Sequence, residues 1–525
     1  MSSATPAANK RLAGDAALLA VAALLVQGAA IVSTVALARI LPLGEFGAYQ
    51  QLLLVYGIVS PLLFGGIPAA LTYYLARART DKERRGWVFD GTISLAVLGA
   101  IFALLLVALR HPLADSLNGG PRLSDALALL APFAVLTFVA ATMPNTLIPS
   151  GRAHLSALLS ALSAVVYVSC VLSAAVIESD VRALALAMGA SAAFSAALAV
   201  GAVGRVVGYR VRWRGLAARS VKFLGYGFPL ALAGLAGLLG FQFDRLVVSA
   251  NFSARVFAVY AVGAVELPLT TIVQQSVNSV LLPELAIRHR DGDLYGVGEL
   301  WREAIRKSSL IILPLFVVSF LLAGDLLPVV FGAPFGGSVA IFRIYLLLMP
   351  LRVATYGIIP MAIGRTGVNF GAAAVTLGAN AVLAIALVGP LGLKGPAWAT
   401  VIATTLSVVY YLVRLREILG LGISALLPWR VLALNLAVSV AASVPLLAIA
   451  QLDLAPALRL ILGGLMYVIT AVWALRITRR ITDEDWARLL GTIRGFLRRH
   501  QGHEEDRSPA ASSTDARSPV SLRRE

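Results

Sequence analysis

The sequence predicts an all-α polytopic membrane protein with about fourteen transmembrane helices. Three observations support this fold class. Hydrophobic residues make up 59% of the 525-residue chain and charged residues only 14%, and the mean hydropathy is +0.84. Apolar stretches of about 20 residues, the length that crosses the hydrocarbon core as a helix, recur along almost the whole chain. Between these stretches lie short clusters of Arg and Lys, which are typical of cytoplasmic loops.

Pro, Gly and basic clusters divide the apolar sequence into fourteen segments. The first covers 14–38, which is too long for the apolar region of a signal peptide. The others are predicted at 47–74, 88–109, 126–148, 154–177, 182–204, 223–248, 255–283, 308–331, 338–362, 367–389, 395–414, 430–450 and 456–476.

The distribution of basic residues predicts the orientation. Every second loop is rich in Arg and Lys, over 77–85, 205–222, 288–307 and 414–416. The loops between them are poor in bases, and one is the acidic stretch 178–180. Since positive charge marks the cytoplasmic side and the alternation never changes phase, the helix count is even. Both termini are therefore expected in the cytoplasm.

The predicted organisation follows from these segments. Residues 1–13 form a cytoplasmic tail, 14–204 a first six-helix bundle, 205–222 a basic cytoplasmic linker, 223–414 a second six-helix bundle, and 430–476 the last two transmembrane helices. The longest internal loop, 284–307, is too short for a catalytic or nucleotide-binding domain. Residues 482–500 are predicted to form an amphipathic interfacial helix, with apolar residues on one face and arginines on the opposite face. The polar, Ser- and Pro-rich tail 501–525 is predicted to be disordered.

Charge and cysteine usage exclude several classes of protein. The formal net charge is +17, but the bases lie in short loops, so they indicate membrane topology and not a nucleic-acid partner. A single cysteine, Cys170, allows no internal disulfide, CxxC metal site or thiol redox pair. The stretch GPLGLKGP at 389–396 lacks the spacing and hydroxyl residue of a phosphate-binding loop. We therefore expect no metal, no cofactor and no ATP-driven step.

A short internal repeat relates the two halves of the chain. Phe46-Gly-Ala-Tyr49 opens the second segment and Phe257-Ala-Val-Tyr260 opens the eighth, and each segment carries a proline toward its inner end, Pro68 and Pro283. The two segments are six helices apart, and an even offset gives both the same direction through the membrane. The repeat therefore favours six plus six plus two helices.

Three stretches resemble a known family. ARILPLGEFGAYQ at 38–50, FDRLVVSANFSARVFAVYAVG at 243–263 and LLPELA at 281–286 are similar to Wzx-type oligosaccharide flippases of the multidrug/oligosaccharidyl-lipid/polysaccharide exporter superfamily. The resemblance covers the fourteen segments but not the C-terminal tail. It implies two six-helix bundles around a central cavity, bordered by helices one, two, seven and eight, that opens alternately to each side of the membrane.

The same resemblance implies a function and its partners. Members of the family are transporters, not enzymes, and move an undecaprenyl-pyrophosphate-linked oligosaccharide across the bacterial inner membrane for surface polysaccharide biosynthesis. The expected partners are this lipid-linked oligosaccharide, the lipid bilayer, and the polysaccharide polymerase and export machinery.

Ionisable residues inside the apolar segments are candidate site residues, because each costs at least about 2.5 kcal/mol to place in hydrocarbon unless it faces a cavity or a partner. Asp244 and Arg245 lie in the outer third of segment seven. As neighbours they point about 100° apart on a helix, so each is expected to have a different partner. They form either an interhelical pair that locks one bundle or an outer gate beside the cavity.

Segment eight carries Glu266, the acid that the pattern predicts to be most buried. Thr270, Gln274 and Asn278 continue an i, i+4 ridge from it, and Pro268 frees a backbone carbonyl nearby. A polar ridge in a bilayer needs water or substrate against it, so it lines the cavity or forms a static hydrogen-bonded seam. Glu266 is the candidate for proton or cation coupling, since burial raises the pKa of a carboxyl group.

Segment ten carries Arg352 near mid-membrane, with Tyr345 and Tyr356 predicted on the same helix face. Guanidinium binds phosphate in a bidentate manner and sugars stack on aromatic rings, so this group suits a pyrophosphate-linked glycan. The alternative is a Tyr-Arg stack within the bundle. Further candidates for a polar cavity wall lie on the first two segments: Gln27, Arg39, Gln50 and Gln51. Arg39 lies beside the turn, and its alternative role is an interface anchor.

Three other functions compete with the flippase hypothesis. Drug/cation antiporters of the same superfamily resemble one another in an acid deep in the first helix, whereas segment one has only Asp15 at its cytoplasmic edge. Lipid II flippases carry arginines in that helix, and segment one has no central arginine. A glycan polymerase or ligase needs a large external loop, which the sequence lacks. Each departure favours the oligosaccharide flippase.

Overall fold

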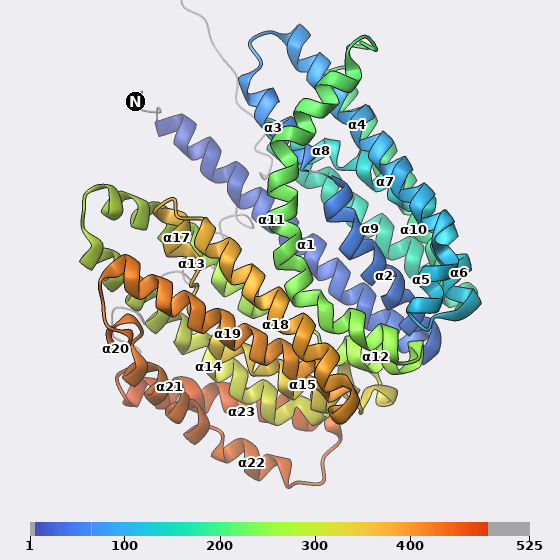
Figure 1. Ribbon diagram of the computed structural model, residues 1–525. Coiled ribbons are helices and arrows are strands. Elements are labelled where there is room, and N and C mark those ends of the chain that lie inside the picture. The colour runs from blue at the N-terminus through green and yellow to red at the C-terminus, as the bar shows by residue number, and fades with distance from the viewer. Residues whose placement is uncertain (1–5, 65, 481–525) are drawn as a thin grey trace, which may run out of the picture.

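The computed structural model describes residues 6–64 and 66–480, and these are almost entirely helical (Figure 1). Eleven helical spans within them are long and apolar enough to cross a membrane, and α12 with α13 forms a bent pair that passes the same test. The other two predicted segments coincide with α11 and with the broken run α15–α17. The all-α membrane fold is therefore confirmed, whereas the predictions for 482–500 and 501–525 lie outside the described residues.

The first ten helices form one lobe, here called the N-lobe. Their bounds are α1 (Pro6–Ile40), α2 (Leu43–Phe64), α3 (Ile67–Arg77), α4 (Asp81–Ala108), α5 (Arg110–Ser116), α6 (Gly120–Leu129), α7 (Ala131–Ala140), α8 (Thr142–Leu147), α9 (Ala153–Ile177) and α10 (Val181–Val206).

The second lobe, the C-lobe, follows α11 (Leu216–Asn251). It contains α12 (Ala254–Gly263), α13 (Pro268–Arg290), α14 (Leu294–Phe331), α15 (Ser338–Leu346), α16 (Leu348–Leu351), α17 (Ile358–Ala362), α18 (Gly367–Leu391), α19 (Lys394–Leu419) and α20 (Ile423–Leu426). The C-terminal helices α21 (Trp429–Ala441) and α23 (Pro456–Ile477) pack on α14, and α22 (Val444–Ala450) packs on α23.

Local sequence explains several helix boundaries. The Thr80 hydroxyl accepts a hydrogen bond from the Glu83 amide at the start of α4, and the Asp180 carboxylate does the same for the Arg182 amide at the start of α10. Both satisfy amides that have no partner in the first helical turn. Between α2 and α3, Gly66 adopts a φ of 65°, a left-handed conformation that side chains disfavour. The predicted segment 47–74 is thus two helices joined at this glycine.

Two predicted boundaries differ from the structure. The internal loop expected over 284–307 is mostly helical, because α13 continues to Arg290 and α14 begins at Leu294. Helix α1 begins at Pro6, within the predicted tail 1–13. In both places charged residues continue a helix beyond its apolar part. Hydropathy alone locates only the apolar part, so it places the helix end too early or the helix start too late.

The two lobes meet at one end and diverge toward the end that carries the N-terminus (Figure 1). Helix α11 connects them. Its first part lies against α3 and α4 of the N-lobe, and its second part packs against α18 of the C-lobe. At the meeting end, α2 packs against α12. The predicted topology identifies this end as external, since the loops 110–119 and 391–394 are both there.

The base-rich end of the molecule is tied together by ion pairs. Asp90 on α4 is fully buried and pairs with Arg212 and Arg219, the latter at 2.7 Å between Nε and Oδ2. The basic linker 205–222 is thereby held on the N-lobe. At the same end, the Arg480 carbonyl accepts a hydrogen bond of 3.4 Å from Arg306 of α14. The last described residues therefore lie beside a predicted cytoplasmic loop.

Candidate functional site

A cavity of about 480 Å³ lies inside the C-lobe, and Arg352 is on its wall. The cavity is enclosed by α11, α13, the break between α16 and α17, α18 and α19. Its polar and aromatic lining comprises Phe241, Gln274, Asn278, Arg352, Thr355, Tyr356, Asn369 and Tyr411. Sequence reasoning placed Gln274, Asn278, Arg352 and Tyr356 together, and the structure does bring these four to one cavity.

Arg352 is held by three groups around the cavity. Its guanidinium forms an ion pair of 2.6 Å with the Glu266 carboxylate, and lies 5.0 Å from the centre of the Phe241 ring. The Gln274 amide donates a hydrogen bond of 2.6 Å to the Arg352 carbonyl. Arg352 is the C-cap of the short helix α16, and the chain from 352 to 357 is not helical. This break exposes backbone carbonyls and turns the guanidinium toward the cavity.

The aromatic and amide groups form the opposite wall. Tyr356 stacks on Tyr411 with ring centroids 6.0 Å apart. The Tyr411 hydroxyl donates to the Asn369 side-chain oxygen at 3.3 Å, and the Asn369 amide donates to the Gly357 carbonyl at 3.1 Å. The Asn278 side-chain oxygen is buried and has no partner among the described residues. Aromatic faces beside amide and guanidinium groups are suited to sugar rings and phosphate.

A second polar cluster surrounds Asp244, whose side chain is completely buried. The Tyr260 hydroxyl donates to Asp244 Oδ2 at 2.6 Å, and the Tyr345 hydroxyl donates to the same oxygen. Arg245 donates instead to the Ala264 carbonyl at 2.9 Å. As the 100° separation predicted, the two neighbouring side chains have different partners. Asp244 thus ties α11, α12 and α15 into one unit and does not line the cavity of Arg352.

The remaining polar candidates lie elsewhere. Arg39 on α1 reaches the C-lobe, where its Nε donates to the Val330 carbonyl at 2.8 Å. Gln51 is fully buried, and its amide donates to the Leu117 carbonyl at 2.6 Å and to the Ser249 hydroxyl at 2.9 Å. Both residues therefore close the external end and do not line the Arg352 cavity, which corrects the expectation for Gln51, whereas for Arg39 an anchoring role beside the turn was the alternative. Gln27 is exposed on α1 and Gln50 is half-buried on α2.

Other contacts complete this external closure. The Asn118 amide donates to the Ala250 carbonyl at 2.6 Å, and the Phe46 and Phe335 rings meet edge to face at 5.6 Å. Gly47 lies directly against Ala254, so closely that a Cβ on Gly47 would be 1.8 Å from the Ala254 carbonyl oxygen. A glycine at this position is what allows α2 and α12 to approach.

Two sequence predictions about the site are wrong, and both assumed continuous helices. Segment eight breaks at 264–267, where α12 and α13 meet at 47°. Glu266 lies in this break and its side chain is 44% exposed, so it is not the most buried acid. Thr270 is buried but still lines one small pocket with Glu266 and Arg352. Segment ten breaks after α16, so Tyr345 bonds Asp244 while Tyr356 faces the cavity. Both tyrosines lie near Arg352, as predicted, but Tyr345 borders a small separate pocket and Tyr356 the larger cavity, so they do not share one helix face.

Sequence reasoning also missed several residues. Phe241, Asn369 and Tyr411 contribute to the cavity, and Asp90 is a buried acid with two arginine partners. Asp90 follows the base-rich loop 77–85 in the sequence, and this is the feature that could have identified it as a partner for arginine. Among the described residues, no group of three His, Cys, Asp or Glu side chains is placed to hold a metal ion.

Comparison with known proteins agrees with this architecture. The model of a family described as polysaccharide biosynthesis protein matches residues 36–340, more than half of the chain. The chain belongs to this family. No curated protein matches it. The matched region of this polysaccharide biosynthesis protein family covers α2 to α14 completely and includes Asp244, Tyr260 and Glu266, but it ends before Tyr345 and Arg352.

Solved structures with the same fold are transporters. A lipid II flippase MurJ in an inward closed conformation is 15% identical, with a TM-score of 0.70 over 88% of this chain and 99% of that chain. A multidrug resistance MATE family transporter in an inward-facing conformation is 14% identical, with a TM-score of 0.63 over 75% and 94%. An outward-facing MATE transporter has 14% identity and a TM-score of 0.51 over 77% and 95%. The fold is therefore that of the multidrug/oligosaccharidyl-lipid/polysaccharide exporter superfamily.

Proposed function

We propose that the chain is a flippase that moves a lipid-linked oligosaccharide, carried on undecaprenyl pyrophosphate, across the bacterial inner membrane. The observation that supports this best is the Arg352 cavity, which combines a guanidinium with aromatic and amide groups in a membrane-spanning lobe. The oligosaccharide headgroup cannot cross hydrocarbon unaided, because burying its polar groups without partners costs several kcal/mol for each. A polar cavity in the bilayer supplies those partners.

The diphosphate of the substrate competes with Glu266 for Arg352. A diphosphate carries more negative charge than one carboxylate and accepts two parallel hydrogen bonds from a guanidinium. Binding therefore separates the Glu266–Arg352 pair, whose partners are 2.6 Å apart. The released Glu266 carboxylate then has no cationic partner in this pair. This exchange of partners at Arg352 makes Glu266 the candidate residue for proton or cation coupling.

Transport requires the external closure to open while the other end closes. The closure consists of the packing of α2 against α12 at Gly47, the Phe46–Phe335 ring contact, and hydrogen bonds of Arg39, Gln51 and Asn118. These contacts are confined to the external end. Breaking them leaves the packing within each lobe intact, so each lobe can rotate as a rigid unit. The lipid tail remains in the bilayer throughout, because only the headgroup needs the cavity.

The test is translocation of a fluorescent undecaprenyl-pyrophosphate oligosaccharide in proteoliposomes, with and without a proton gradient. Arg352→Lys should retain part of the transport, and Arg352→Ala should lose roughly 10- to 100-fold, since hydrogen bonds to charged groups contribute about 1.5–3 kcal/mol. Arg343→Ala is the matched control, because this nearby guanidinium contacts the Phe320 ring and carbonyl and not the cavity. Equal transport by all four proteins would exclude Arg352 from the site.

Glu266→Gln tests the coupling separately. The variant should bind the lipid-linked glycan at least as tightly as the wild type, because Arg352 no longer has a carboxylate partner, yet its transport should not respond to the proton gradient. An unchanged response to the gradient would contradict the coupling role and leave the flippase proposal standing.

Lipid II is a second candidate substrate, and a specific observation favours it. The similarity to the lipid II flippase covers 99% of that chain. Parallel proteoliposome assays with lipid II and with a lipid-linked oligosaccharide lacking peptide would separate the two substrates. Efflux of a cationic dye without transport of either lipid would instead favour a drug antiporter.

A further inference from the structure

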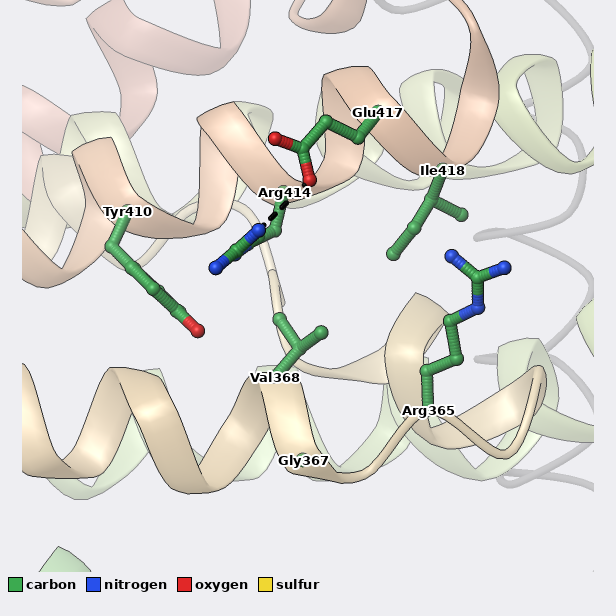
Figure 2. A pocket seen from close by; sticks show the side chains of 7 residues that line it. All are labelled: Arg365, Gly367, Val368, Tyr410, Arg414, Glu417 and Ile418. Atoms are coloured by element: carbon green, nitrogen blue, oxygen red, sulfur yellow. Dashed lines mark hydrogen bonds and ion pairs between the residues drawn. The ribbon is translucent and has the colours of Figure 1, made fainter.

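A separate pocket lies at the base-rich end of the C-lobe, between the start of α18 and the end of α19. Its volume is about 370 Å³, and Arg365, Tyr410, Arg414 and Glu417 supply its polar lining. Figure 2 shows both guanidinium groups and the Tyr410 hydroxyl in the space between these helices. Tyr410 borders this pocket whereas the next residue, Tyr411, borders the Arg352 cavity. The pocket thus adjoins the cavity but has its own charged groups.

The positive charge in this pocket is only partly neutralised. The Arg414 guanidinium pairs with the Glu417 carboxylate at 3.0 Å, and these side chains are 46% and 56% exposed. Such exposed pairs are weak and exchange partners readily. In the described part of the chain, the Arg365 side chain has no hydrogen bond or ion pair. Two guanidinium groups therefore face one space that contains a single carboxylate.

The backbone around the pocket holds its groups in place. Gly364 has a φ of 77° and makes the turn that brings Arg365 to the start of α18. Gly371, one turn into that helix, leaves room for Tyr410: a Cβ on Gly371 would be 2.2 Å from the Tyr410 hydroxyl oxygen. The hydroxyl is thus fixed against α18 and beside the arginines, where it can donate to an acceptor.

The surroundings of the pocket indicate a membrane ligand. The start of α18 and the end of α19 are ends of two helices that are long and apolar enough to span a membrane, and the ends of such spans are expected at the depth of lipid phosphates. Large apolar side chains beside the pocket are exposed: Phe370, Val409 and Val413. An exposed apolar surface next to a cluster of arginines fits a molecule with an apolar chain and an anionic head.

We propose that the Arg365–Arg414 pocket binds a phosphate group of a membrane lipid. Guanidinium groups bind phosphate oxygens in pairs, and the Tyr410 hydroxyl donates a further hydrogen bond. The phosphate takes Arg414 from Glu417 and gives Arg365 the partner that it lacks. Two lipids carry this chemistry, an isoprenyl diphosphate such as the carrier of a lipid-linked glycan and an anionic phospholipid.

Equilibrium binding to the purified full-length chain in neutral detergent tests the proposal. The probes are farnesyl diphosphate, dioctanoyl phosphatidylglycerol, and dioctanoylglycerol as a control without phosphate. The background variant is Arg352→Gln, which removes the cationic group of the neighbouring cavity, so the readout does not depend on transport. Adding Arg365→Gln and Arg414→Gln should raise the Kd of at least one phosphate probe tenfold or more. Adding Lys394→Gln, at the opposite end of α19, should leave it unchanged.

The pattern of loss identifies the ligand. If the double variant weakens binding of farnesyl diphosphate alone, the ligand is an isoprenyl diphosphate. If it weakens binding of phosphatidylglycerol alone, the ligand is a phospholipid. If it weakens binding of both probes, the pocket is a general site for lipid phosphates. Unchanged binding of both phosphate probes, or an equal loss with Lys394→Gln, would overturn it. Arg365→Lys with Arg414→Lys keeps the charge and should retain much of the affinity, which separates loss of binding from loss of folding. Failure of the flippase proposal would show instead in transport by Arg352 variants.

Discussion

The external closure depends on Gly47, so Gly47→Ala should favour the opposite, outward-open arrangement of the lobes. A Cβ on this residue would be 1.8 Å from the Ala254 carbonyl oxygen and 2.5 Å from its carbon, whereas such contacts are essentially never shorter than 3.0 Å. Both close atoms belong to the backbone, so no side-chain rotation relieves the overlap. Helices α2 and α12 must separate by more than an ångström.

The size of the effect follows from this overlap. Inserting a methyl group into a well-packed contact costs about 1–3 kcal/mol. The two helices belong to different lobes, so the cost applies only while the external end is closed. A destabilisation of this size changes the ratio of closed to open molecules by roughly 5- to 150-fold. The open state should therefore become detectable in the variant even where it is rare in the wild type.

Spin-label distance measurements check this prediction. Cys170 is the single native cysteine, so a Cys170→Ser background accepts labels at Ser116→Cys and Lys394→Cys, which are exposed on different lobes at the external end. The Gly47→Ala variant should add a longer distance to the distribution. Gly44→Ala is the matched control, because a Cβ there meets nothing within 4 Å. An unchanged distribution for Gly47→Ala, or an equal change for Gly44→Ala, would refute the reasoning.

Two further predictions concern stability. Asp90→Asn should lower the free energy of unfolding by about 3 kcal/mol, because it leaves Arg212 and Arg219 without their buried carboxylate; a thermal-unfolding midpoint equal to wild type would contradict this. Asp180→Ala should cost about 1 kcal/mol at neutral pH through loss of the α10 cap. Hydrogen bonds from Arg182 lower the pKa of the Asp180 carboxyl below its ordinary 3.8, so the cap stabilises the fold above that pH. The stabilisation is lost as the pH falls through the lowered pKa, and the melting difference from Asp180→Ala should shrink in acid and persist at neutral pH.

The positions of the helices could be predicted from the sequence because hydrocarbon imposes one requirement on every span. Each backbone group must be satisfied within its own helix, so length and hydropathy identify the spans. The breaks within spans could not be predicted in this way. The turn at 264–267 and the unwound stretch 352–357 lie at cavity walls, where neighbouring groups satisfy the backbone. Because the sequence stays apolar across such breaks, its length predicts one continuous helix there.

The partners of the site residues depended on these breaks. Tyr345 and Asp244 are 101 positions apart, and only the packing of α15 against α11 and α12 brings them together. Likewise, Glu266 reaches Arg352 because the chain turns at 264–267. The residue types that matter were visible in the sequence, since ionisable groups in apolar segments are rare. Their pairing required the tertiary structure.

Helix α11 determines how the two lobes can move relative to each other. Phe223 in its first part is fully buried, where its ring meets those of Tyr74 and Trp87 of the N-lobe. Further along, Gly240 lies against Thr376 of α18, and the Asn380 side-chain amide donates a hydrogen bond of 2.8 Å to the Gly240 carbonyl. The start of α11 is thus fixed to the N-lobe and the part around Gly240 to the C-lobe, while its last residues contact the N-lobe through the external closure. Any rotation between the lobes must therefore bend α11 between 223 and 240, where Pro229 interrupts the helix hydrogen bonds and several glycines leave open space. We therefore expect α11 to be the element that bends when the lobes rock.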